Sequence, residues 1–154
     1  MMTSTACACQ SGLDYNVCCQ PVLSNHNKAS MATQLMRARY SAFTLGKIDF
    51  LLQTLHPDKR QPDDREHLET ICATTTWLGL TILANTQQTD TASVEFVAFY
   101  DDSPLGQLHE RSQFTYETGL WFYRDGLILP PVSLPRNAVC LCGSGLKFKR
   151  CHGR

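Results

Sequence analysis

The chain has 154 residues, which is enough for one domain with a real core and no disulfide staples. Its 14 basic and 14 acidic side chains balance, so no net charge draws the whole molecule toward nucleic acid or an anionic membrane. Residues 1–10 lack the basic and apolar regions of a signal peptide, and no apolar run approaches the roughly 20 residues that span a bilayer, so we expect a cytoplasmic protein without membrane segments.

The first feature along the chain is a cluster of four cysteines: Cys7, Cys9, Cys18 and Cys19. In a reducing compartment, clustered cysteines more often hold a metal than form disulfides. A bridge between the adjacent Cys18 and Cys19 would also close a strained ring. Disulfides and unligated thiols remain the alternatives. We expect residues 1–29 to form a small zinc knuckle followed by a connector.

The central domain is placed at residues 30–135. Apolar periodicity, with glycine or proline near the ends, predicts helices at residues 31–45, 48–55 and 62–73. Ser30 is suited to cap the first helix and Gly46 to end it. β-Branched and aromatic residues then predict strands at residues 76–84, 93–100, 108–116 and 120–123.

Turn residues separate these strands, and the Arg124-Asp-Gly126 segment is predicted to close the last one. Helices followed by a run of strands are typical of an α+β domain, in which the helices pack on one face of a largely antiparallel, curved sheet. We also expect this domain to keep its fold without either cysteine cluster.

A second cluster lies in the tail, residues 136–154, and consists of Cys140, Cys142, Cys151 and His152. It repeats the first cluster at a constant offset of 133 residues, with His152 in the place of Cys19. A serine, a glycine and a leucine between the ligands repeat at the same offset. Cysteine and histidine are both ordinary zinc ligands, and four protein ligands leave no open position for water or substrate. The sequence therefore predicts two structural zinc ions.

The tail sequence Cys140-Leu-Cys-Gly-Ser-Gly-Leu-Lys-Phe-Lys-Arg-Cys-His-Gly153 resembles the SEC-C motif, named for the C-terminal zinc tail of the SecA preprotein translocase. The resemblance implies that its three cysteines and His152 hold the metal. The N-terminal copy has Gln10 for a glycine and Asp14 for a lysine, so its ligands transfer while its basic face does not.

One such motif at each end, joined by Met36-Arg-Ala-Arg-Tyr-Ser-Ala-Phe43, resembles the YchJ family of bacterial proteins of unknown function. The likeness covers nearly the whole chain. It implies that the central domain is a nuclear-transport-factor-2-like (NTF2-like) cone, and it implies no activity.

The concave face of such a cone often holds a pocket. Arg39 lies at the edge of the apolar helix stripe, and Glu110, in an apolar row of the third strand, is the expected counter-ion. The possible lining comprises Arg39, Tyr40, His56, Trp77, Glu110 and Phe114, with Trp121 and Tyr123 as further candidates if they face inward. A buried Arg–Glu pair is more often a packing feature than a catalytic one, so no catalytic residue is predicted. His26 and His109 are expected to face solvent.

Two functional hypotheses follow. The first is a non-enzymatic docking module, because Lys147, Lys149 and Arg150 surround the second zinc site and SEC-C tails in the translocase dock on a chaperone and the ribosome. Its partner would be a protein or a ribosomal surface. The alternative is a small-molecule binder or enzyme that uses the pocket. Sequence-specific DNA binding is not expected, because a tail of five charges with one aromatic gives only salt-sensitive, non-specific affinity.

Overall fold

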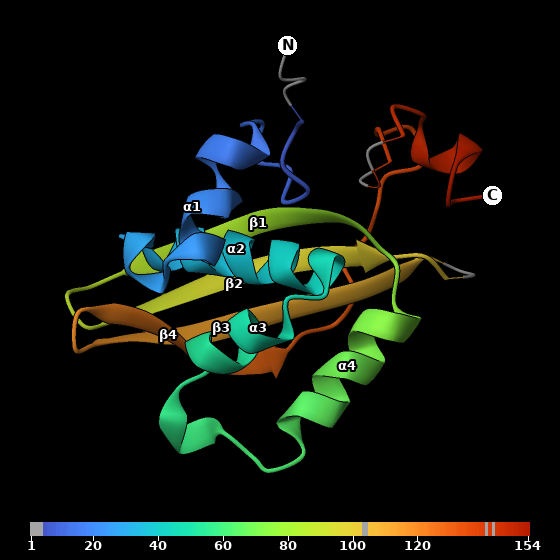
Figure 1. The fold of residues 1–154 in the computed structure, drawn as a ribbon. Coiled ribbons are helices and arrows are strands. Elements are labelled where there is room, and N and C mark those ends of the chain that lie inside the picture. Colours follow the sequence, from blue (N-terminus) through green and yellow to red (C-terminus); the bar gives the residue numbers. More distant parts are fainter. Residues whose placement is uncertain (1–4, 103–104, 141, 143) are drawn as a thin grey trace.

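The computed structural model describes residues 5–102, 105–140, 142 and 144–154. Its centre is a four-stranded antiparallel sheet of order β1-β2-β3-β4, with helices on one face (Figure 1). The strands are β1 (Trp77–Gln87), β2 (Thr91–Tyr100), β3 (Gly106–Glu117) and β4 (Leu120–Ile128). The predicted α+β architecture is confirmed.

The helices are α1 (Cys19–Ser24), α2 (Ala32–Leu45), α3 (Ile48–Thr54) and α4 (Asp64–Thr74). Helix α2 lies across the concave face of the sheet and contacts β1, β2 and β4. It ends at Gly46, whose φ of 71° is a left-handed conformation that suits glycine. The side-chain oxygen of Gln34 caps the start of α2. It accepts hydrogen bonds from Ser30 and from the backbone N–H of Met31, which have no backbone partner within the helix.

Several boundaries differ from the prediction. Helix α2 begins at Ala32 with Met31, not Ser30, at its N-cap, and β1, β2 and β3 each extend two or three residues beyond one predicted end. The connector after the first cluster contains α1, and α4 begins at Asp64 rather than at residue 62. Strand β4 continues through the predicted turn at residues 124–126 to Ile128. Gly126 is needed there for a close approach, because a Cβ at this position would lie 1.6 Å from Oε1 of Glu110 on β3. None of the described helices is long and apolar enough to cross a membrane.

The buried core lies between α2 and the sheet and extends into the N-terminal cluster. Leu35, Leu51 and Phe114 are almost fully buried, and Cys7, Cys9 and Cys19 belong to the same continuous apolar cluster. Helix α1 packs directly on α2 (Figure 1). The structure therefore argues against a central domain whose core is independent of the first cluster.

Two histidines predicted to face solvent do not. His26 is 4 % exposed, its Nε2 contacts the carbonyl of Trp121, and its ring packs edge-on against Phe122. His109 is held by the carbonyl of Pro130 at 2.7 Å from Nδ1 and by a carboxylate oxygen of Glu95 at 3.1 Å from Nε2. Each ring has a hydrogen-bond partner from a distant part of the chain, so the sequence alone did not show that these histidines are held inside the fold.

Candidate metal centres and central pocket

The N-terminal centre is built by a short turn and a helical turn. The backbone N–H of Cys7 donates to the carbonyl of Leu13 at 2.9 Å, and Gly12 has a φ of 88° that lets the chain reverse. A 3-10 turn at Tyr15–Val17 and the start of α1 then bring Cys18 and Cys19 back to the first pair. The four ligand sulfurs all lie within 4.8 Å of one another.

The C-terminal centre repeats this construction in detail. Cys140 N–H donates to the Leu146 carbonyl at 2.7 Å, Gly145 has a φ of 79°, and a 3-10 turn at Phe148–Arg150 precedes the last two ligands. The isolated bridges Ala6↔Asp14 and Val139↔Lys147 also occupy equivalent positions. The repeat in the sequence is therefore a repeat of backbone structure at the same offset.

The donor atoms fit a tetrahedral metal. A Zn–S bond of about 2.3 Å in a tetrahedron places two sulfurs roughly 3.8 Å apart. The sulfur–sulfur distances are 3.6 Å for Cys9–Cys18, 3.9 Å for Cys18–Cys19 and 3.6 Å for Cys142–Cys151. Nδ1 of His152 lies 3.5 Å from the sulfur of Cys140 and 3.2 Å from that of Cys151. Each group of four residues could hold one metal ion.

The thiols ionise unequally. The hydrogen bond from Cys19 lowers the pKa of Cys9 to about 4, whereas donation to Cys9, together with burial, raises the pKa of Cys19. In the second centre, burial opposes ionisation of Cys142, but the hydrogen bonds from Ser144, Cys140 and Cys151 together outweigh it and lower the pKa of Cys142 to about 6. One thiolate per centre is thus stabilised by its neighbours, and ionisation of the remaining thiols calls for a cation among them.

The protein surrounds the two centres differently. At the N-terminal centre, Nη1 of Arg37 lies 2.8 Å from the carbonyl oxygen and 3.7 Å from the sulfur of Cys9, and Ser41 lies 3.7 Å from the sulfur of Cys7. A site of four thiolates and one divalent ion carries two negative charges, which a neighbouring guanidinium offsets. Arg37 and Ser41 were not among the predicted site residues; their spacing of four residues places them on one face of α2, but only the packed structure shows that this face meets the cysteines.

Gln10 fastens the N-terminal knuckle to the sheet. Its side chain donates to the carbonyl of Leu78 and accepts from the N–H of Leu80, both on the edge strand β1. Its φ of 59° is the left-handed conformation that explains why glycine is usual there. The departure from the motif thus provides a contact with β1 that a glycine would not make.

The C-terminal centre stands apart from the body (Figure 1). Lys147 and Arg150 are exposed and Lys149 is half-buried. Residues 136–154 contain no carboxylate side chain, and none of these three cations has an ion pair among the described residues. The three residues predicted to bind a partner thus lie together on a protruding knuckle.

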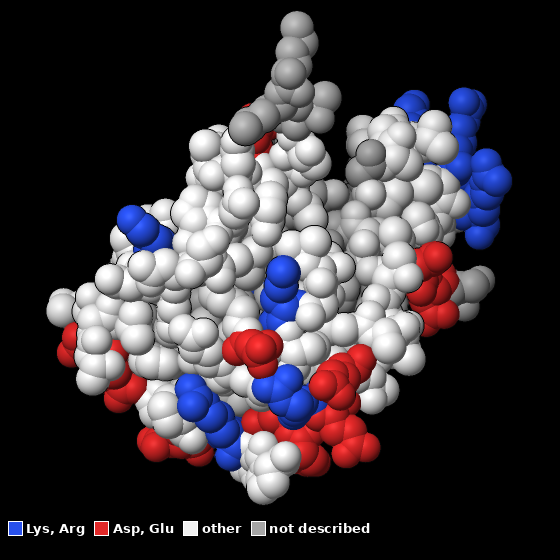
Figure 2. Space-filling view, in the orientation of Figure 1, with Lys and Arg blue, Asp and Glu red and all other residues white. Residues whose placement is uncertain are grey.

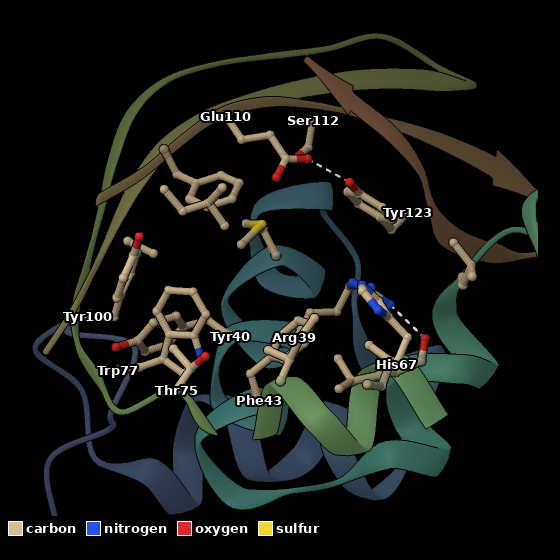
Figure 3. Close-up of a pocket in the computed structure, with 18 of the residues that line it drawn as sticks. Arg39, Tyr40, Phe43, His67, Thr75, Trp77, Tyr100, Glu110, Ser112 and Tyr123 are labelled. Atoms are coloured by element: carbon tan, nitrogen blue, oxygen red, sulfur yellow. Dashed lines mark hydrogen bonds between the residues drawn. The ribbon is translucent and has the colours of Figure 1, made fainter. Parts of the chain in front are cut away.

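A pocket of about 540 Å³ lies between α2, α3, α4 and the concave face of the sheet. Arg39, Tyr40, Trp77 and Glu110 line it, as does Tyr123, and Figure 3 shows their arrangement. Its other walls are mostly apolar and include Met36, Phe43, Leu68, Ile71, Tyr100 and Leu108.

Arg39 and Glu110 do not form the direct ion pair that was expected, judged on the contacts of the described residues. Arg39 donates through Nη1 to the Leu51 carbonyl at 2.9 Å and to Thr54 Oγ1 at 2.6 Å, and its guanidinium lies 4.7 Å from the centre of the Tyr123 ring. The Tyr123 hydroxyl in turn donates to Glu110 at 2.6 Å. Burial lowers the pKa of Arg39 to about 10, so it stays a cation at neutral pH.

His56 and Phe114, also expected in the pocket, are not among its described lining residues. The backbone N–H of His56 donates to the Tyr123 carbonyl, and its ring contacts Glu117, which turns it away from the cavity. Phe114 is 1 % exposed and packs edge-on against Tyr123 from within the core. Trp121 is also buried, with its indole N–H near the Ser30 carbonyl.

Comparison with known proteins decides the family. A model of the YchJ middle NTF2-like domain matches residues 31–126, which is more than half of the chain, and a model of the SEC-C motif matches residues 136–154. The chain belongs to the YchJ family. Proteins named UPF0225 from Pectobacterium carotovorum and Yersinia pseudotuberculosis are 40 % and 42 % identical, and each match covers 98 % of this chain and 99 % of the relative.

Two solved structures are similar to this YchJ-family chain. The solution structure of a SEC-C motif containing protein from Rhodopseudomonas palustris has a TM-score of 0.75 and 31 % identity, with 80 % of this chain and 98 % of that chain covered. The crystal structure of a SEC-C motif containing protein from Psychrobacter arcticus has a TM-score of 0.67 and 32 % identity, covering 96 % and 94 %. The predicted NTF2-like cone is thereby confirmed.

Proposed function

We propose that the chain is a zinc-stabilised docking module whose C-terminal knuckle binds an acidic surface of a protein partner. The observation that supports this most strongly is the unequal placement of two copies of one motif. The first copy contributes Cys7, Cys9 and Cys19 to the core of the central domain. The second copy stands clear of the body and carries Lys147, Lys149 and Arg150 instead of the Asp14, Asn16 and Val17 of the first.

The charge distribution supports the proposal. Figure 2 shows Lys and Arg gathered on the outer side of the C-terminal knuckle with no Asp or Glu among them. Nε of Arg154 donates to the Arg150 carbonyl, which keeps a further cation at the same knuckle. Such a compact patch speeds encounters with an anionic partner and orients it.

Zinc is the metal that suits these ligands best. Thiolate and imidazole donors in tetrahedral arrangement are typical of structural zinc, and four protein ligands close each site. The metal would hold the knuckle rigid. The backbone that carries the cationic residues would therefore lose little conformational entropy when the partner binds.

An acidic protein is a better candidate than RNA. Binding to single-stranded RNA draws much of its affinity from bases stacked on exposed aromatic rings. The single aromatic of this knuckle, Phe148, is half-buried, and its ring packs so closely against Gly153 that a Cβ there would lie 2.7 Å from it. The patch therefore offers charge without a stacking platform.

The test is a triple charge reversal, Lys147→Glu with Lys149→Glu and Arg150→Glu. Its control, Lys28→Glu with Lys47→Glu and Lys59→Glu, changes the net charge equally on the body of the protein. Proteins recovered from lysate with the wild type and identified by mass spectrometry should be lost with the tail variant, retained with the control and retained after ribonuclease treatment.

Zinc content and melting temperature should stay nearly the same in the tail variant, because Lys147 and Arg150 are exposed, Lys149 is half-buried, and none of the three has an ion pair among the described residues. Equal loss of partners in both variants would show unspecific charge attraction and contradict the proposal. If ribonuclease treatment removes the recovered proteins, the partner is RNA and not an acidic protein surface.

A further inference from the structure

The central pocket has an apolar end and a polar end. At the apolar end, Trp77 packs edge-on against Tyr40 and Tyr100 and at a tilt against Phe43, with ring centres 5.7 to 6.3 Å apart. Helix α4 adds Leu68 and Ile71, and no residue of that helix is fully buried. The apolar face of α4 therefore borders the cavity instead of being covered by protein, which leaves room for an organic ligand.

Glu110 occupies the polar end, and its two carboxylate oxygens have different surroundings. Oε1 accepts hydrogen bonds from Tyr123 at 2.6 Å and from Ser112 at 3.1 Å. Among the described residues, Oε2 accepts no hydrogen bond from the protein. Figure 3 shows the second oxygen of Glu110 turned away from Tyr123 and toward the interior of the pocket. The side chain is only 7 % exposed, and Oε2 is not among the fully buried atoms without a partner, so this oxygen keeps access to the open space of the pocket.

The orientation of this carboxylate is fixed by its neighbours. Gly126 lies directly against Oε1, since a Cβ at that position would meet this oxygen at 1.6 Å. Burial and the nearby Glu110 charge raise the pKa of Tyr123, so its hydroxyl stays protonated and remains the donor. With Oε1 held by two hydroxyl donors and seated on a glycine, Oε2 is presented in one direction.

The negative charge of Glu110 lacks a cation in contact with it. Both of its donors are neutral hydroxyls, and Arg39, the one guanidinium among the described lining residues, bonds instead to Leu51 and Thr54 and lies over the Tyr123 ring. Asp64 adds a second carboxylate to the lining. Besides the imidazole of His67, the described lining thus holds two carboxylates against one guanidinium, so its fixed charges are short of a cation.

We infer that the central pocket binds an organic ammonium ion, a primary or secondary amine with an aromatic or aliphatic body, whose N–H donates to Oε2 of Glu110. The body packs between α4 and the aromatic side chains around Trp77. A charge-assisted hydrogen bond to a buried carboxylate is stronger than one between neutral groups, and an amine next to aromatic faces gains further electrostatic attraction. This site is separate from the docking knuckle and does not depend on it.

In the test, the full-length protein is titrated with phenethylamine, tryptamine and octylamine and with the alcohol that has the same skeleton as each amine. Binding is measured by calorimetry and by changes in amide chemical shifts. Indole-3-acetate serves as the anionic probe. At least one amine should bind about tenfold more tightly than its alcohol, with shifts in residues of the pocket wall, and indole-3-acetate should bind more weakly than tryptamine.

The decisive variant is Glu110→Gln, which is isosteric and can still accept from Tyr123 and Ser112. It should lower amine affinity at least about tenfold and leave alcohol binding unchanged, which also shows that the pocket is intact. The matched control is Glu66→Gln, which removes the same charge from α4 outside the described lining and should leave amine affinity unaltered.

Three results would overturn the inference: binding of none of the amines up to millimolar concentration, alcohols or indole-3-acetate binding as tightly as the amines, or Glu110→Gln leaving amine affinity unchanged. Loss of amine binding in Glu110→Gln with recovery of protein partners unaffected would separate this site from the docking function.

Discussion

A neutral imidazole in the core makes the stability of this protein sensitive to pH. Burial, with a smaller contribution from the charge of Arg39, lowers the pKa of His26, although its hydrogen bond to the Trp121 carbonyl acts in the opposite direction. The unfolded chain would hold this histidine at a pKa of about 6.5. Between the two values the unfolded state binds more protons, so unfolding becomes easier as pH falls.

The first prediction is that His26→Phe reduces this acid sensitivity. The contribution of His26 is fully present above about pH 6.5 and is lost as pH falls toward its folded pKa. From pH 7.5 to 5.5, the wild type should therefore lose more free energy of unfolding than the variant does. Urea unfolding at both pH values, with zinc content measured in each sample, gives the comparison. Equal losses of free energy of unfolding in the two proteins would show that His26 does not cause the acid sensitivity.

At the same scale, the spacing of the sequence predicted all eight residues that meet in the two clusters, because ligands held on short turns depend on local geometry. The residues around them could not be predicted in the same way. Gln10 reaches β1, some seventy residues later, and Arg37 reaches Cys9 only because α1 packs on α2. Contacts of this kind depend on tertiary packing, which one sequence does not display.

At the scale of elements, the edge strand β1 and the first knuckle are joined by one side chain. The left-handed conformation of Gln10 costs a residue with a Cβ about 1 kcal/mol relative to glycine. Its two hydrogen bonds, at 3.4 and 3.2 Å to the β1 backbone, offset that cost.

The second prediction compares Gln10→Ala with Gln10→Gly. Both variants lose the two hydrogen bonds, but only alanine keeps the backbone strain, so the alanine variant should be the less stable of the two by about 1 kcal/mol. Urea unfolding followed by tryptophan fluorescence measures the difference. An alanine variant as stable as the glycine variant would contradict the role assigned to this conformation.

The helices and strands themselves were largely predictable, because apolar periodicity and turn residues are local signals. The errors have physical causes. Gly126 was interpreted as a turn residue, but it lies in β4 where the side chain of Glu110 leaves no room for a Cβ. His56 follows the end of α3 as predicted, yet its backbone bond to Tyr123 directs its ring away from the pocket.

At the scale of the whole molecule, two copies of one motif have different structural roles. The first is continuous with the apolar core, while the second joins the body through the chain that follows β4. Loss of metal should therefore affect the two ends differently, even though the two ligand sets are built alike. The different charges of the two copies are visible in the sequence. Their different burial is visible only in the structure.

The last prediction compares Cys7→Ser with Cys19→Ser in one variant and Cys140→Ser with Cys151→Ser in another. The wild type should contain two zinc ions per chain by elemental analysis, and each variant one. In the first variant, serine hydroxyls replace ligands that are 4 % and 1 % exposed and belong to the core. The free energy of unfolding should then fall by at least about 2 kcal/mol, because metal binding and apolar packing are lost together.

The second variant should lose its metal with little change in the unfolding of the central domain. Both tryptophans of the chain, Trp77 and Trp121, lie in that domain, so their fluorescence reports its unfolding without interference from the tail. Equal destabilisation by the two variants would contradict the assigned asymmetry, and a wild type with less than one zinc per chain and intact disulfides would contradict the metal assignment itself. If the tail is an independent docking element held by its metal, the second variant should lose the structure of the tail and the recovery of partners. The central domain should stay folded.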